Sequence, residues 1–279
     1  MIRNLSLAAR IGLGFGLVAA LLLATGLISA ISQLRSVDAF EEYRLLVRDA
    51  ELAERLEISA LRLDARVTSF LGAHGQRQDR TYVEESITSF DEGLANLTEL
   101  VAQAQQDITK QERRPLVEGI AGDVDTYGDA FDSLIGLVQR RDEIVRGTLD
   151  VAGPAAEEAL TEILVSAQED DDLIASYYAG LSLRNLLLAR LYMEKYLVTN
   201  EAERGDRVFN EFAALNENLS TLDRELQNPE RRVLLEEVRG RTSEYEGAFG
   251  ELVGVIEERN RLARETLEAF PAGGGQHDD

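Results

Sequence analysis

The sequence has 279 residues, of which 44% are apolar and only 6% aromatic, and its formal net charge is −22 at pH 7. This charge argues against nucleic acid as a partner. The chain has no Cys and only two His, His74 and His277, which leaves no thiolate metal site, metal cluster or Ser-His-Asp triad to assemble. We therefore predict a protein that is not an enzyme and that holds no metal or cofactor.

The N-terminal part of the chain predicts a membrane anchor. Residues 11–34 carry no charged side chain, and about 20 apolar residues suffice to cross a bilayer. Because Arg3 and Arg10 precede this segment, we expect residues 1–10 in the cytoplasm and residues 35–279 in the periplasm, with the chain integral to the inner membrane. The alternative is a cleaved signal peptide, whose apolar region is usually shorter, about 7–15 residues.

The rest of the sequence predicts an all-α fold. Apolar residues recur at alternating steps of three and four from Val83 to Ile108, from Leu116 to Val138 and from Leu234 to Ile256, as on the buried face of a helix. No segment alternates like a strand. We expect helices over residues 35–73, 79–108, 112–150, 173–198, 204–226 and 230–270. Gly153-Pro154 and Pro271 are expected to end the third helix of each half, because Pro interrupts the hydrogen-bond ladder.

The two halves of this helical region are copies of one another. Residues 112–149 and 230–267 are identical at 15 of 38 positions when compared at a shift of 118. Upstream, Phe70-Leu71 corresponds to Tyr196-Leu197 at a shift of 126. The sequence therefore predicts an internal duplication, with copies at about 35–153 and 173–270.

Three segments point to a known family: residues 188–200 (LARLYMEKYLVTN), 228–232 (NPERR) and 258–262 (ERNRL). With the duplication, they resemble the helical bimodular sensor domain of methyl-accepting chemotaxis proteins and of some histidine kinases. The N-terminal span resembles the first transmembrane helix of the chemotaxis receptors. The resemblance implies two stacked four-helix-bundle modules, each copy giving one helix at the membrane level and one hairpin farther out, in a homodimer that binds a small organic acid.

The resemblance also implies segments that this sequence lacks. In the family a second transmembrane helix, a HAMP linker and a cytoplasmic signalling region follow, whereas residues 271–279 read as a disordered polar tail. We expect a receptor truncated before its second span, which meets the cytoplasmic signalling machinery only if an output region follows. The expected function is sensing of small carboxylates for chemotaxis. The alternatives are the sensor region of a histidine kinase and a membrane-anchored helical scaffold without a small ligand.

Five residues form the predicted ligand site: Arg62, Arg66, Arg184, Arg190 and Tyr192. The arginines interrupt otherwise apolar helix faces, and a buried charge is costly unless it is paired. The shift of 126 places Arg190 level with Asp64, between Arg62 and Arg66, so that the four arginines are expected to converge on a ligand carboxylate. The resemblance also implies arginines on these helices as ligands.

Other interpretations of the charged residues stay open. The same arginines can pair internally with Asp64, Glu57 or Glu194, or extend their head groups to solvent. Arg141 and Arg259 occupy equivalent apolar positions in both copies, which favours structural ion pairs. The acidic run at residues 169–172 is expected to be a solvated turn.

Overall fold

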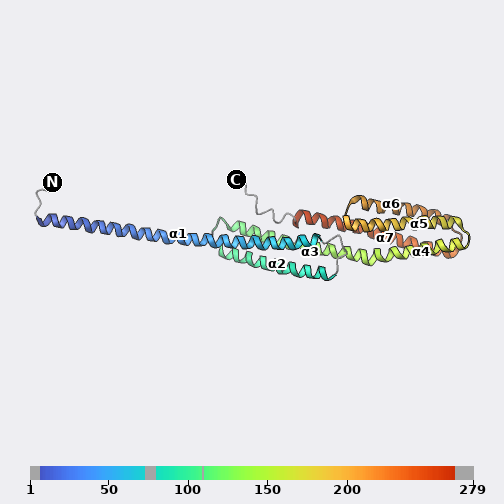
Figure 1. The fold of residues 1–279 in the computed structure, drawn as a ribbon, viewed down its shortest axis with the longest axis horizontal. Coiled ribbons are helices and arrows are strands. Elements are labelled where there is room, and N and C mark those ends of the chain that lie inside the picture. Colours follow the sequence, from blue (N-terminus) through green and yellow to red (C-terminus); the bar gives the residue numbers. More distant parts are fainter. Residues whose placement is uncertain (1–6, 73–79, 109, 268–279) are drawn as a thin grey trace.

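The computed structural model describes residues 7–72, 80–108 and 110–267, and every regular element in these ranges is helical, which confirms the all-α prediction. The elements are α1 (Leu7–Gly72), α2 (Arg80–Asp107), α3 (Arg114–Glu143), η3 (Ile144–Leu149), α4 (Asp150–Glu169), α5 (Leu173–Thr199), α6 (Ala202–Glu225), α7 (Pro229–Leu262) and η4 (Ala263–Leu267). The elements η3 and η4 are π-helical. The molecule is an elongated rod, and α1 extends beyond the other helices at one end (Figure 1).

The helix α1 joins two segments that the sequence predicts separately. The predicted span at residues 11–34 and the predicted helix at 35–73 form one continuous helix, of which most side chains between residues 11 and 39 lie outside the described residues. Within the described ranges no helix combines the length and apolarity that a bilayer crossing requires. The predicted tail at 271–279 and His74 also lie outside the described residues.

The termini of the C-terminal helices follow from local capping residues. Asp172 accepts a hydrogen bond from the Ala175 amide at the start of α5, and Asn228 accepts two at the start of α7, where Pro229 occupies the first helical position. Asn200 ends α5 in the left-handed conformation, with φ of 53°. Asp and Asn side chains satisfy the free N–H groups of a first turn, and Asn tolerates positive φ better than most residues.

The chain does not leave its helix at Gly153-Pro154, so that prediction is wrong. The elements α3, η3 and α4 follow one another without a break, and Pro154 lies inside α4. Pro154 has no N–H to donate to the carbonyl of Asp150, the first residue of α4. The π-helical turn η3 ends just before Asp150 and already changes the spacing of the backbone hydrogen bonds there. The chain therefore continues outward and turns only at residues 170–172.

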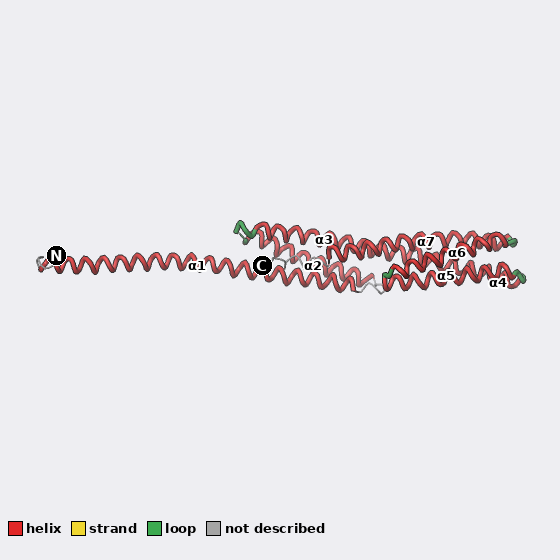
Figure 2. The backbone as a smooth tube through the Cα atoms, turned by 90° about the horizontal axis from the view of Figure 1, so that it is seen from above, coloured by secondary structure: helices red, strands yellow, loops and turns green. Residues whose placement is uncertain are grey.

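Two hydrophobic cores lie end to end along the rod. The first core gathers buried residues between Leu52 and Val138 from α1, α2 and α3. The second core gathers buried residues between Ile144 and Ile256 from η3 and α4 to α7. In this second unit α4 contacts α5 and α7, and α6 contacts the same two helices, which closes a ring of four. Figure 2 shows the two units one after the other along the long axis.

The copies are therefore arranged differently from the prediction. The first copy places α2, α3 and the part of α1 from Leu52 onward in the first unit, and the hairpin of the second copy, α5 and α6, lies in the second unit. The cause is the continuation of the third helix through Pro154, which starts the second copy at the outer end of the rod. Among the described residues of the second copy, α7 and η4 contact α3, and η4 also contacts α1.

Candidate anion-binding site

Arg62 and Arg66 lie on α1 in the first unit, and both are exposed where the sequence predicts a buried face. The Arg66 guanidinium donates a hydrogen bond to the carbonyl oxygen of Ser89 on α2. It also lines a groove of about 360 Å³ over the aromatic residues Phe70 and Phe90. Arg62 does not line this groove.

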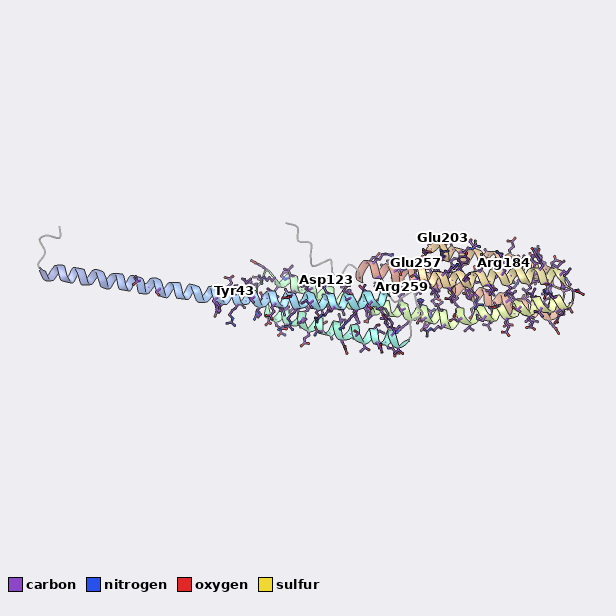
Figure 3. The ribbon with its side chains drawn as sticks, viewed as in Figure 1. Tyr43, Asp123, Arg184, Glu203, Glu257 and Arg259 are labelled. Carbon is purple, nitrogen blue, oxygen red and sulfur yellow. The ribbon has the colours of Figure 1, made fainter. Side chains whose placement is uncertain are left out.

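The other predicted residues lie on α5 in the second unit. Arg184 is exposed, and Figure 3 shows it farther out along α5 than the middle of the rod. Arg190 is half-buried and forms an ion pair with Glu157 on α4. Tyr192 is half-buried beneath two cations, with Lys195 Nζ 4.9 Å and Arg207 Cζ 5.5 Å from its ring centroid.

The four predicted arginines do not converge. Arg66 belongs to the groove in the first unit, whereas Arg190 lines a different cavity in the second unit. A constant shift in sequence number identifies equivalent residues in the two copies. Because the copies lie at different positions along the rod, equivalent residues such as those near Arg66 and Arg190 do not lie close together in space. Internal pairing, one of the alternative interpretations, is what Arg190 shows, with Glu157 as its partner.

A pair of arginines that the sequence places in both copies lies between the two cores. On the third helix of the first copy, Val138 belongs to the first core and Ile144 to the second, with Arg141 between them. On α7, Ile256 belongs to the second core and Leu262 packs against the first, with Arg259 between them. Both arginines are 7% exposed. They form a buried polar layer, which we call the junction layer, and Figure 3 shows Arg259 near the middle of the rod.

The arginines of the junction layer have few anionic partners. Arg141 Nη1 donates to Asp142 Oδ1 at 2.9 Å, and Asp142 also faces Arg146 at 3.8 Å. Arg259 Nη2 donates to the amide oxygens of Asn200 and Asn260, both at 2.5 Å, and within the described ranges it has no carboxylate partner. The predicted structural ion pair is therefore confirmed for Arg141, whereas for Arg259 the described residues provide only amide oxygens.

The electrostatics of Arg259 reflect this shortage of negative charge. Burial, followed by the charge of Arg141, lowers the pKa of Arg259 to about 10. Desolvation and a like charge both disfavour the charged form of a base. Because Arg stays protonated at neutral pH even so, the junction layer keeps two buried positive charges inside a strongly acidic protein.

A π-helical turn follows each of these arginines at the equivalent place in the two copies. The turn η3 begins three residues after Arg141, and η4 begins four residues after Arg259. Such turns occur often at functional sites because they interrupt the regular ladder. The equivalence of the arginines is visible in the sequence, but no sequence pattern indicates that both helices cross from one core to the other at that level.

The geometry suits an anion in chemical terms, since guanidinium groups bind carboxylates through charge-assisted hydrogen bonds.

Residues 54–269 match the family model of the helical bimodular sensor domain. The chain belongs to the helical bimodular sensor domain family. This is an extracytoplasmic helical sensor domain of a kind typical of chemoreceptors, so the chain has a sensing role. Neither curated proteins nor solved structures gave a match.

Proposed function

We propose that the helical bimodular domain senses small organic anions, carboxylates above all, and that the junction layer is the site that binds them. The single observation that supports this most is the position of Arg259, which is buried beside Arg141 and has only amide oxygens as hydrogen-bond partners within the described residues. A bound carboxylate would supply the missing negative charge. It would also contact helices from both copies at once.

A second candidate for the carboxylate site is the groove beside Arg66, with Arg62 on the same helix, as the sequence suggests. Its support is weaker, because both side chains are exposed. An exposed guanidinium already solvated by water gains less from an anion than a buried one. Arg184 and Tyr192 would then belong to neither site.

The receptor context is part of the proposal. We infer a chemoreceptor of the methyl-accepting class, anchored in the inner membrane through residues 11–34, with residues 35–279 in the periplasm and a homodimer as the working form. Two stacked four-helix bundles would result if a helix following α7 completed the first unit. The sensor region of a histidine kinase is the alternative receptor class, and a scaffold without ligand is the alternative function.

A thermal-shift screen of the full chain in detergent tests the proposal. The compounds are di- and tricarboxylates, amino acids and purines. A ligand at about 100 times its Kd adds about 2.7 kcal/mol to the free energy of unfolding. Stabilisation by carboxylates is the expected result, and no shift with any compound would favour the scaffold.

A further inference from the structure

Two equivalent tyrosines, one in each unit, differ in the hydrogen bonding of their hydroxyl groups. Tyr127 on α3 hydrogen-bonds through its hydroxyl to Asp64 on α1. The equivalent Tyr245 on α7 is fully buried, and its hydroxyl has no hydrogen-bond partner among the residues described. Arg190 corresponds to Asp64 in the sequence at the shift of 126, and its charge acts on Tyr245. The second unit therefore has the cation Arg190 where the first unit has the acceptor Asp64, and the Tyr245 hydroxyl has no acceptor among the described residues.

Tyr245 lines a cavity of about 410 Å³ between α4 and α5, and its hydroxyl group is buried. Arg190 lines this cavity together with three carboxylates, those of Asp150, Glu157 and Glu194. Burial raises the pKa of Tyr245 well above its usual range, the Arg190 charge opposes this, and Glu194 and Asp150 add to it. These charges therefore all act at the hydroxyl group.

We propose that this cavity binds an α-amino acid with an apolar side chain. Carboxylates outnumber the guanidinium in the lining, which favours a ligand with an ammonium group close to Asp150 and Glu194. The Arg190 ion pair with Glu157 engages Nη1, and a guanidinium has five N–H donors, so Arg190 can hold a ligand carboxylate as well. The Tyr245 hydroxyl gives that carboxylate a second donor.

The remaining wall of the cavity determines what the rest of the ligand must be. Leu149, Leu187, Leu191 and Met193 supply apolar side chains from η3 and α5. Such a surface favours an aliphatic ligand side chain, because its burial removes apolar area from water. A simple dicarboxylate would bring further negative charge to a lining that is already negative. This site therefore differs in charge and in place from the junction layer.

Calorimetric titration of the full chain with L-leucine, L-valine and L-methionine tests the proposal. Two analogues of leucine probe its charged groups separately: 4-methylpentanoate lacks the ammonium, and 3-methylbutylamine lacks the carboxylate. We expect binding of at least one amino acid, and affinity weaker by about tenfold or more for each analogue of leucine. Absence of binding by all three amino acids would overturn the proposal, as would analogues that bind as tightly as leucine.

Two site variants and two control variants locate the site. Asp150→Asn removes the charge at nearly constant shape, and Tyr245→Phe removes only the hydroxyl, so both are expected to fold and to weaken amino-acid binding about tenfold. Tyr127→Phe is the matched control in the other unit and should leave it unchanged. Unaltered affinity in both site variants would contradict the assignment.

Arg259→Met should not change amino-acid binding, so this proposal and the proposed carboxylate sensing succeed or fail separately.

Discussion

Arg231 at the start of α7 and Asp172 at the start of α5 form an ion pair 3.2 Å long that ties the outer end of the second unit together. Arg231 is 3% exposed, and it also donates to the carbonyl oxygen of Ser166 at 2.5 Å and pairs with Asp170. The acidic run at residues 169–172 is thus more than a solvated turn. The equivalent Arg113 pairs with Asp49 at 2.7 Å in the first unit.

Loss of the Arg231 clamp should destabilise the protein. Arg231→Ala removes several charge-assisted hydrogen bonds at once, and we expect the free energy of unfolding to fall by about 1.5–3 kcal/mol. Arg241→Ala is the control, because Arg241 and Glu244 are both exposed and such pairs contribute about 0–1 kcal/mol. Chemical denaturation measures both, and equal losses would show that the clamp is unimportant.

Gly153 permits the close approach of α4 to Arg190 and Tyr245. A Cβ at this position would lie 3.0 Å from Arg190 Nε and 3.0 Å from Tyr245 Cε2. Because Tyr245 is fully buried and has little room to move, Gly153→Ala should cost about 1–3 kcal/mol through overpacking. Gly250→Ala, where nothing lies within 4 Å, should instead stabilise the helix by about 0.5–1 kcal/mol. Thermal melts that rank the two variants in the opposite order would refute this.

The stability of the first unit should depend on the ionisation of Asp64. Burial raises the pKa of Asp64, an effect partly offset by the hydrogen bond from Tyr127. A raised folded-state pKa means that the contribution of this group is present in acid and is lost as the pH rises through that pKa. Asp64→Asn keeps an acceptor for Tyr127 and removes the charge.

We therefore expect Asp64→Asn to be more stable than the wild type at pH 7, with the difference shrinking as the pH falls below the Asp64 pKa. Denaturant melts at a series of pH values measure this difference. A difference that grows toward acid would have the wrong sign for a desolvated carboxyl.

Most helices follow from the sequence, because apolar spacing is a local signal, but α4 (Asp150–Glu169) has no counterpart among the predicted helices. The duplication also identified the equivalent residues correctly, among them Arg141 and Arg259. The duplication gave no information on the position of each copy along the rod, because this position depends on whether the chain turns at Pro154 or continues to residue 169. The predicted meeting of Arg66 and Arg190 failed for this reason, whereas the junction layer depends on packing between two cores that no local pattern encodes.

In the absence of ligand, the junction layer should tolerate the loss of Arg259. Arg259→Met removes a buried charge that is repelled by Arg141. The groups that lose their hydrogen-bond donor are the amide oxygens of Asn200 and Asn260, which are uncharged. We expect the free energy of unfolding without ligand to stay equal or to rise by about 1–4 kcal/mol. A loss of about 3–5 kcal/mol, as for a broken buried ion pair, would mean that Arg259 has an unrecognised structural partner.

The most direct test of carboxylate sensing at the junction layer is calorimetric titration of succinate and malate into the wild type, Arg141→Met and Arg259→Met, with Arg241→Ala as the control. The account predicts binding to the wild type and to the control, weakened in each junction variant by about 10- to 100-fold, the scale of one charged hydrogen bond. Equal affinity in all four proteins, or no binding by the wild type, would contradict it.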